Sequence, residues 1–458
     1  MRSGAYLAAV ALSIASAPLL IRHLGVAQFG AYVTVMSLMN LVAGVTEGGL
    51  NAIALREYAT RGGAARRAAL RALLGVRLAL SIGGVLVGVG FALLAGYDTP
   101  LVVGAIGAGT GVVLQAVQML VGTPLQGELR FGWLSTLTLL GQVATVALVV
   151  VLVVVDAGLV EFLWITAPVG LLLLAITLVL VGRAMPLRPS LRWAEVWPLL
   201  RDTLPFTAAV AVNVVYFRVT ILVMSLRASE LETGYFATSF RVVEVLLGVP
   251  ALVIGAAFPI LARAERDDAD RFAYAMRRIL EMALILGAWM AICCVAGAQV
   301  AIDVLAGGEA QPAVGVLRIQ GLTLAATGIA VACGYALLTL RRYAPMLWMN
   351  GAALVGSVVL TLALVGPLGA QGAALATLGA ELVLCAGLLV VLLRERPELT
   401  GGLRGAPAIL AVAGAAVAAG LLTGLPGLVG FALANVVFVA GLVLVRRFPP
   451  EVRELLRR

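Results

Sequence analysis

Residues 133–155 read WLSTLTLLGQVATVALVVVLVVV and contain no charged side chain. As a helix, which rises about 1.5 Å per residue, this stretch is about 34 Å long and can cross roughly 30 Å of hydrocarbon. Its valines, leucines and alanines come in unbroken runs, without the alternation that a strand of a membrane β-barrel requires. The stretch therefore predicts a transmembrane helix.

The composition extends this interpretation to the whole chain. Its 458 residues are 62% hydrophobic and 12% charged, with a mean hydropathy of +1.08, whereas soluble proteins are roughly half apolar and about a quarter charged. All basic residues are arginines, and their place in short loops favours a role in membrane topology over nucleic-acid binding. We therefore expect an all-α integral membrane protein.

Apolar stretches of about 20 residues recur along the chain, and they predict about fourteen transmembrane helices. Their approximate ranges are 4–21, 32–55, 73–94, 101–123, 133–155, 161–182, 205–226, 235–262, 279–302, 317–340, 346–366, 372–393, 407–423 and 428–445. The first span also has the pattern of a signal peptide, with Arg2 before it and Ala15-Ser16-Ala17 near its end. The second span returns the chain to the cytoplasm in either case.

The loop arginines indicate the orientation in the membrane. With the N-terminus in the cytoplasm, most arginines fall in cytoplasmic segments, among them the group Arg56, Arg61, Arg66, Arg67, Arg71 and Arg77. This bias follows the positive-inside rule. We therefore expect a multi-pass protein of the bacterial cytoplasmic (inner) membrane with both termini in the cytoplasm.

An internal repeat divides the predicted spans into two halves. Gly30-Ala31-Tyr32 opens the second span and Gly234-Tyr235-Phe236 the eighth, and an arginine-rich loop follows each, from Arg56 and from Arg263. Between the halves, residues 190–204 have an amphipathic pattern typical of an interfacial helix. We expect an N-terminal six-helix lobe, a cytoplasmic linker helix, a C-terminal six-helix lobe, and two extra transmembrane helices with a cytoplasmic tail. Their ranges are 1–182, 183–204, 205–393 and 394–458.

Several of the same segments resemble the oligosaccharide flippases, the polysaccharide-transporter branch of the multidrug/oligosaccharidyl-lipid/polysaccharide exporter superfamily. The resemblance spreads over about residues 1–395. The segments that carry it are Arg22-His23-Leu24-Gly25, Gln28-Phe29-Gly30-Ala31-Tyr32, Leu55-Arg56-Glu57-Tyr58, Leu204-Pro205-Phe206, Gly234-Tyr235-Phe236-Ala237, Phe240-Arg241-Val242-Val243-Glu244 and Gly369-Ala370-Gln371-Gly372-Ala373-Ala374-Leu375-Ala376-Thr377.

The resemblance implies two six-helix lobes around a central cavity, plus two C-terminal helices. It implies transport rather than enzymatic activity: polyprenyl-pyrophosphate-linked oligosaccharides would move across the membrane by alternating access, for lipopolysaccharide, exopolysaccharide or a related surface glycan. Its partners would be the lipid-linked oligosaccharide, membrane lipids, and a glycan polymerase with other export machinery. The chain departs from the family where the seventh span has Arg218-Val219-Thr220 in place of an Arg-x-Asp pair.

Charged side chains within the spans are the candidate functional residues, because such charges cost about 2.5–3.5 kcal/mol on insertion scales and usually face a cavity or a partner. Arg218, beside Asn213 and Tyr216, is a candidate ligand for pyrophosphate, which guanidinium binds bidentately. Arg241 is a second candidate. Glu244 follows it at i+3, so an intrahelical salt bridge is the simpler interpretation of that pair.

Three acids are candidates for coupling transport to protons or sodium. They are Glu47 in the second span, Glu244 in the eighth and Glu381 in the twelfth. Each can equally pair with an arginine or line a water-filled cavity. No cofactor is expected beyond such a coupling ion.

Amides within the spans have two interpretations. Gln115, Gln118 and Gln142 can bind sugar hydroxyls, with Gln115 the candidate ligand, but such amides more often join helices. The acidic cluster Asp267-Asp268-Ala269-Asp270 stands alone, without the second acidic motif of a metal–diphosphate site, so no metal site is expected.

Two alternatives to the oligosaccharide flippase remain. One is a cation-coupled multidrug exporter or lipid II flippase of the same superfamily. The other is an integral-membrane glycan polymerase or ligase, which the short outer loops disfavour.

Overall fold

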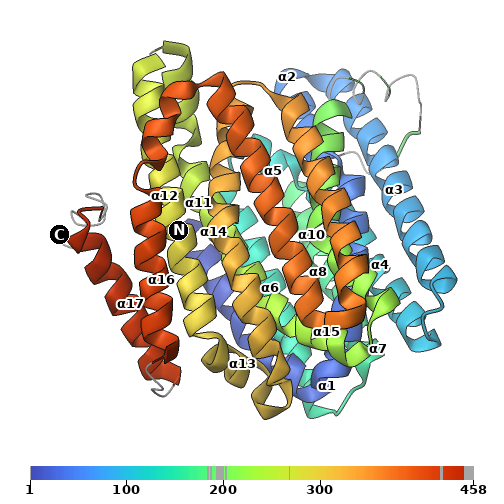
Figure 1. Ribbon diagram of the computed structural model, residues 1–458. Helices are drawn as coiled ribbons and strands as arrows, with labels where there is room; N and C mark the ends of the chain where they lie inside the picture. The colour runs from blue at the N-terminus through green and yellow to red at the C-terminus, as the bar shows by residue number, and fades with distance from the viewer. Residues whose placement is uncertain are drawn as a thin grey trace. The chain divides into compact units, whose positions relative to one another are not determined.

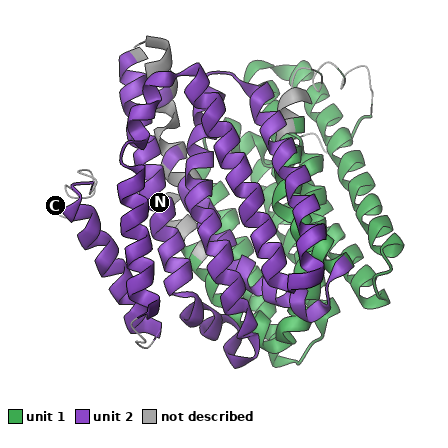
Figure 2. Cartoon of the chain, in the orientation of Figure 1, with its two compact units in different colours: residues 1–226 green, residues 227–458 purple. Residues whose placement is uncertain are grey.

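The computed structural model describes residues 2–182, 185, 188–191, 197, 201, 204–267, 269–422 and 427–447. Every regular element in these ranges is a helix, as the composition predicted. The chain forms two compact units, Met1–Leu226 and Arg227–Arg458, which Figure 2 colours separately. Each unit is described below by itself.

Unit 1 consists of eight described helices and most of a ninth. They are α1 (Arg2–Glu47), α2 (Leu50–Thr60), α3 (Gly63–Leu94), α4 (Thr99–Val121), α5 (Thr123–Gly127), α6 (Phe131–Val154), α7 (Leu159–Trp164), α8 (Thr166–Val181) and α10 (Leu204–Arg227), labelled in Figure 1. One apolar cluster joins α2, α3, α4 and α5 through Leu50, Leu73 and Leu120. A second joins α1 to α4 and α7 through Met39, Ala105 and Leu163. These clusters fix α2 and α3 against the rest of the unit.

Unit 2 begins at the last residue of α10 and contains the remaining described helices. They are α11 (Glu230–Asp267), α12 (Ala269–Ala296), α13 (Ala298–Ala306), the short 3₁₀ helix η2 (Gly307–Ala310), α14 (Pro312–Thr339), α15 (Tyr343–Glu395), a second 3₁₀ helix η3 (Pro397–Leu403), α16 (Ala406–Leu422) and α17 (Gly427–Leu444). The helices α16 and α17 pack on α12 through Ile409, Phe438 and Ile292. The two predicted extra spans are thus part of this unit's apolar core.

Within the described ranges, ten helical segments are long and apolar enough to cross a membrane. The longest are Ala11–Thr60, of 50 residues, and Tyr343–Glu395, of 53 residues. A span needs about 20 residues, so each of these two is long enough for two passes. The predicted count of fourteen spans stays a prediction.

Gly369 divides α15 into two antiparallel limbs. Its backbone is not helical (φ 54°, ψ −132°) and Pro367 lies just before it. The limbs pack along their length, because a Cβ at Gly379 would lie 3.1 Å from Leu360, and one at Gly387 would overlap the Met349 sulfur. Both limbs meet near the α15 label in Figure 1. The spans predicted at 346–366 and 372–393 therefore form one helical hairpin.

Glycine also sets how closely α12 and α14 approach each other. A Cβ added at Gly287 would lie 2.8 Å from the Leu324 carbonyl oxygen, and one at Gly328 would lie 2.6 Å from the Ala283 carbonyl oxygen. Small residues allow this backbone contact between membrane helices. The crossing holds α14, which carries the buried Gln320, Thr323 and Thr327, against α12.

The predicted domain limits are only partly covered. The compact units divide the chain after Leu226, at the end of α10, whereas the predicted lobes divide it at 183–204. That predicted linker helix, like the cytoplasmic tail beyond 447, lies mostly outside the described residues. The division into two six-helix lobes and two extra helices stays a prediction.

Candidate functional site

The predicted site residues lie in both units. Glu47, Gln115, Asn213 and Arg218 belong to unit 1, whereas Arg241, Glu244 and Glu381 belong to unit 2. The prediction that they line one substrate cavity therefore stays a prediction.

In α10, Arg218 and Asn213 are both half-buried. They are five residues apart, so at 3.6 residues per turn their side chains leave the helix about 140° apart. Asn213 shares a face with the buried Tyr216, which stacks edge-on against Phe217. Arg218 is thus presented from a different face of α10 than Asn213.

In α11, Arg241 and Glu244 form the predicted ion pair. Nη1 of Arg241 donates to Oε2 of Glu244 at 3.0 Å, and both side chains are about one-third exposed. The intrahelical salt bridge is confirmed. Such i,i+3 pairs contribute only about 0.2–0.5 kcal/mol to stability. This small contribution does not by itself explain why two charged residues lie within a long apolar helix.

Glu381 is 3% exposed and takes part in a series of polar contacts in unit 2. Its Oε1 accepts a 2.7 Å hydrogen bond from the Thr327 hydroxyl on α14. Along α14, Thr327 and Thr323 donate to the backbone carbonyl oxygens of Thr323 and Gln320. Oε1 of Gln320 accepts a 2.7 Å hydrogen bond from Ser239 on α11. Polar groups from three helices thus meet inside an apolar unit. Burying a carboxyl group there costs free energy unless a hydrogen bond, an ion or an opposite charge compensates for the lost water.

The glutamines of unit 1 divide between the two interpretations. Nε2 of Gln118 donates to the Thr177 hydroxyl at 3.1 Å and so joins α4 to α8, the helix-joining role. Gln115, one turn earlier on α4, is exposed. Its proposed contact with a glycan stays a prediction.

Glu47 lies at a break in the predicted second span. It is the last residue of α1, and Gly48 (φ 45°) and Gly49 (φ 73°) separate it from α2. Such left-handed backbone favours glycine. Nδ2 of Asn51, in the first turn of α2, donates to Oε1 of Glu47 at 3.0 Å. The carboxylate therefore bridges the two helices across a flexible glycine pair.

The sequence predicts that Arg77 belongs to the cytoplasmic arginines, and the side of the membrane on which it lies stays a prediction, but its burial was not expected. It lies in the interior of α3, only 2% exposed, and neither Nε nor Nη1 has a hydrogen-bond partner among the residues that the structure describes. Glu47 is the acid whose charge acts on it. An arginine stays charged under all ordinary conditions, so the buried guanidinium of Arg77 and the carboxylate of Glu47 form a charged pair in unit 1. Nothing in the sequence indicated this burial, because Arg77 follows closely on Arg66, Arg67 and Arg71, which lie in the first part of the same helix.

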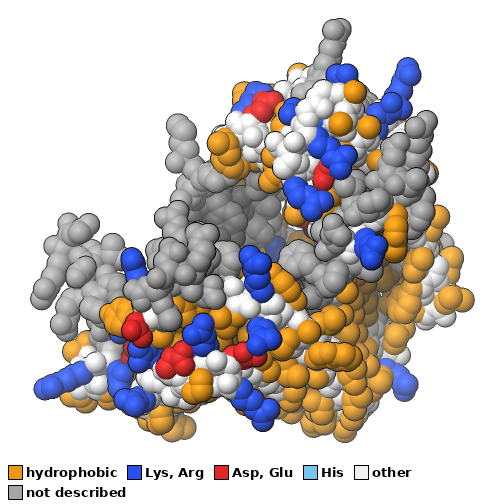
Figure 3. Space-filling model, turned by 90° about the horizontal axis from the view of Figure 1, so that it is seen from above, with side chains coloured by type: hydrophobic (Ala, Val, Ile, Leu, Met, Phe, Trp, Pro, Cys, Tyr) orange, Lys and Arg blue, Asp and Glu red, His pale blue; other side chains and the backbone are white. Residues whose placement is uncertain are grey.

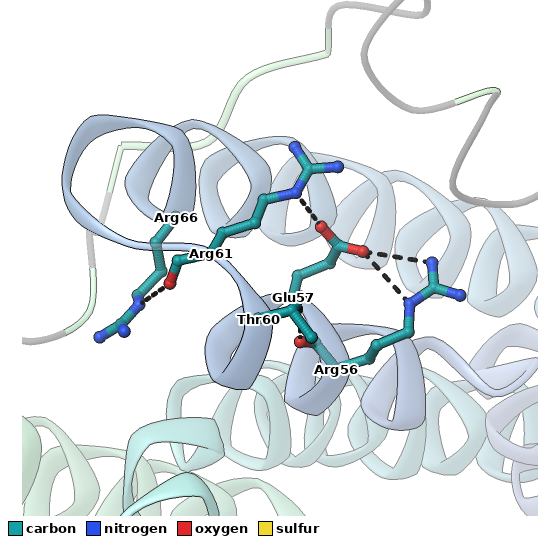
Figure 4. A network of polar contacts seen from close by, with 5 residues as sticks. All are labelled: Arg56, Glu57, Thr60, Arg61 and Arg66. Atoms are coloured by element: carbon teal, nitrogen blue, oxygen red, sulfur yellow. Dashed lines mark hydrogen bonds and ion pairs between the residues drawn. The ribbon is translucent and has the colours of Figure 1, made fainter.

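A third polar group surrounds Glu57 on α2, and Figure 4 shows it from close by. Oε1 of Glu57 accepts hydrogen bonds from Nε and Nη2 of Arg56 at 3.3 and 3.2 Å, and Oε2 pairs with Nε of Arg61. Arg66 donates to the Arg61 carbonyl oxygen at 2.8 Å and covers the Tyr58 ring at 4.4 Å. From the sequence, these arginines are expected to act in membrane topology alone.

The surroundings of this network are also ordered. The Tyr58 hydroxyl donates to Glu128 at 2.9 Å, which ties α2 to the chain between α5 and α6. Figure 3 looks onto the end of the molecule where the α2–α3 connection lies, and arginine side chains gather there with acidic ones among them. The arginines beside the end of the segment Ala11–Thr60 are therefore held by specific contacts.

Metal and disulfide chemistry find no support in the described part of the chain. No group of three or more His, Cys, Asp or Glu side chains there can hold a metal ion. All four cysteines are free; Cys294, Cys333 and Cys385 are buried and Cys293 is half-buried. Asp268 of the acidic cluster lies outside the described residues.

Taken together, the helices and their length and composition define an all-helical, multi-pass membrane protein. The chain belongs to the family described as "Polysaccharide biosynthesis protein", whose profile matches residues 19–315. No curated protein sequence matches it.

Two solved structures show the same fold. "Lipid II flippase MurJ, inward closed conformation" is 13% identical, with a TM-score of 0.79 over 97% of this chain and 98% of that one. "Inward-facing conformation of a multidrug resistance MATE family transporter of the MOP superfamily" is 12% identical, with a TM-score of 0.67 over 88% of this chain and 95% of that one. The family match confirms the predicted resemblance to polysaccharide-biosynthesis proteins, and the solved structures confirm the predicted fold class. At these identities, the likeness concerns the fold alone.

Proposed function

We propose that this protein is a flippase that moves polyprenyl-pyrophosphate-linked oligosaccharides across the bacterial cytoplasmic membrane by alternating access. It is not an enzyme in this proposal, and it serves surface polysaccharide biosynthesis, with lipopolysaccharide or exopolysaccharide as the product class. Both termini lie in the cytoplasm, and a glycan polymerase takes over the exported substrate.

The observation that carries this proposal is the presence of arginines within the helices of a polysaccharide-biosynthesis family member. Arg218 and Arg241 are half-buried in α10 and α11. Guanidinium groups bind phosphate oxygens bidentately, whereas a site for drug cations needs acids and aromatic rings. An anionic cargo fits these residues better than a cationic one.

A second candidate is transport of lipid II, which also has a pyrophosphate group. The fold match to a structure described as a lipid II flippase supports it. The two cargoes differ in the glycan, and the phosphate-binding residues do not discriminate between them.

Energy for the cycle comes from proton or sodium binding in this proposal. Glu381, Glu47 and Glu244 are the candidate groups. Glu381 is supported by its burial and by its contact with Thr327.

The test is transport by the purified protein in proteoliposomes. Fluorescent lipid-linked oligosaccharide, lipid II and a fluorescent drug cation are supplied in separate samples, with imposed proton or sodium gradients. We expect movement of the lipid-linked oligosaccharide, lost in Arg218→Ala protein. Efflux of the drug cation, with both glycolipids immobile, would reject the flippase proposal.

A further inference from the structure

The arginines at the end of α2 are organised around a buried acid. Glu57 is 5% exposed in its side chain, whereas Arg56 and Arg61, which pair with it, are 47% and 45% exposed. Figure 4 shows both guanidinium groups converging on the one carboxylate. Exposed ion pairs contribute only about 0–1 kcal/mol to stability. Stability alone therefore does not account for two exposed arginines held by one buried carboxylate.

The network leaves donors unused on its outer side. Glu57 engages Nε and Nη2 of Arg56 and Nε of Arg61. Among the residues that the structure describes, the other guanidinium nitrogens of this pair have no acceptor. With Arg66 held alongside, positive charge exceeds negative charge in the network. The group therefore offers fixed N–H donors to an anion.

Its position indicates which anion. The membrane-capable segment Ala11–Thr60 ends beside these arginines, and the end of a transmembrane helix lies near the lipid head groups. Phosphate oxygens match the fork of a guanidinium group. We propose that Arg56 and Arg61, positioned by Glu57, bind the pyrophosphate of a lipid-linked substrate at the membrane surface. The lipid-linked ligand rests on the proposed function above; the pyrophosphate site does not.

The role of Glu57 separates this site from a diffuse positive surface. If only the net field attracted the anion, removing the negative charge of Glu57 would strengthen binding. In a positioned site, Glu57→Gln releases the side chains of Arg56 and Arg61. Binding must then order them at a cost in conformational entropy, so the affinity falls. The two hypotheses predict opposite signs for Glu57→Gln.

The experiment measures binding without transport, so its failure is distinct from failure of the flippase proposal. The full-length protein is placed in phosphatidylcholine nanodiscs, and Kd is measured for inorganic pyrophosphate and for farnesyl pyrophosphate. Variants are Arg56→Ala, Arg61→Ala and Glu57→Gln, with Arg56→Lys/Arg61→Lys to keep the charge and remove the fork. Arg67→Ala is the matched control, because Arg67 is an exposed arginine of α3 just beyond the network. Melting temperatures show that each variant is folded.

We expect both probes to bind, and each alanine variant to weaken binding at least about tenfold, or about 1.4 kcal/mol. The Glu57→Gln and double-lysine variants weaken it about three- to tenfold, and Arg67→Ala changes it less than about twofold. Tighter binding by Glu57→Gln, or an equal loss in Arg67→Ala, overturns the positioned site. Displacement of farnesyl pyrophosphate by phosphatidylglycerol in the nanodisc overturns its assignment to the lipid-linked substrate.

Discussion

The Thr327 hydroxyl oxygen on α14 lies 2.7 Å from Oε1 of Glu381 on α15 and 3.0 Å from the carbonyl oxygen of Thr323. A hydroxyl has one hydrogen to donate. That hydrogen is shared between the backbone of α14 and the carboxyl group of Glu381, so the contact ties α14 to α15. The proposed coupling through Glu381 makes this contact the one to test.

We expect Glu381→Gln to fold normally, because the amide oxygen can accept the hydrogen bond from Thr327 as the carboxyl oxygen does. Its transport should no longer respond to an imposed proton gradient. Thr327→Val should destabilise the protein by about 1–3 kcal/mol, because it leaves a buried carboxyl without that partner. Thr377→Val is the control, since the Thr377 hydroxyl donates only to the Ala373 carbonyl oxygen of its own helix. Unchanged gradient dependence in Glu381→Gln would remove Glu381 from coupling.

The charged pair of Glu47 and Arg77 should contribute to the stability of unit 1. Glu47→Gln leaves Arg77 buried without a counter-charge, and such changes destabilise by as much as about 3–5 kcal/mol in a fully buried pair. We expect about 1–3 kcal/mol here, since Glu47 is only half-buried. The double variant Glu47→Gln/Arg77→Met removes both charges and should recover at least half of the loss.

Thermal melting in detergent measures these effects. Glu395→Gln is the matched control, because its partner Arg342 is 55% exposed and the pair should contribute less than about 1 kcal/mol. If the double variant is no more stable than Glu47→Gln alone, the two residues do not act as a pair.

Arg77 also shows what the sequence could and could not predict. Hydropathy placed the helices well, because long apolar runs depend on composition alone; α6 ends within one residue of the predicted 133–155. The side of a helix on which an arginine lies depends on tertiary packing, so Arg77 was grouped with loop residues. The i+3 spacing was enough for Arg241 and Glu244, because that contact is local. The clustering of Arg56 and Arg61 around Glu57 is also a contact between residues close in the chain, but nothing in the sequence indicated that Glu57 is buried.

Arg218 is the sharpest test of cargo. Arg218→Ala should abolish transport of the lipid-linked oligosaccharide while the protein stays inserted at wild-type level, because the loss concerns phosphate binding rather than folding. Arg227→Ala is the control, since Arg227 is exposed at the last turn of the same helix. Surface glycan in cells and flipping in proteoliposomes give two readouts. Normal surface glycan in Arg218→Ala cells excludes the residue from the mechanism.

A substitution of Glu244 can show whether its ion pair with Arg241 in α11 stabilises the helix or serves transport. Glu244→Gln should change stability by less than about 0.5 kcal/mol, because partly exposed pairs on one helix contribute little. If Glu244 tunes Arg241 for substrate, the same variant should lower the transport rate severalfold. A variant with full transport rate and slightly reduced stability would show that the pair is only structural.

Gly369 gives the final prediction, which concerns the helical hairpin of α15. Its backbone (φ 54°, ψ −132°) lies in a region that only glycine adopts without strain. A Cβ there would also overlap the Glu232 carboxylate, whose Oε2 accepts a 2.6 Å hydrogen bond from the Ala370 N–H. Gly369→Ala should therefore destabilise unit 2 by about 3 kcal/mol or more.

The matched control for this change is Gly351→Ala in the same helix. Gly351 is helical and a Cβ there meets nothing within 4 Å, so alanine should stabilise the protein by up to about 1 kcal/mol. Melting temperatures of the two variants should thus move in opposite directions. If Gly369→Ala melts like the wild type, the turn between the limbs of α15 is not held by its glycine and the Glu232 contact. The hairpin would then depend on the packing of Gly379 and Gly387 alone.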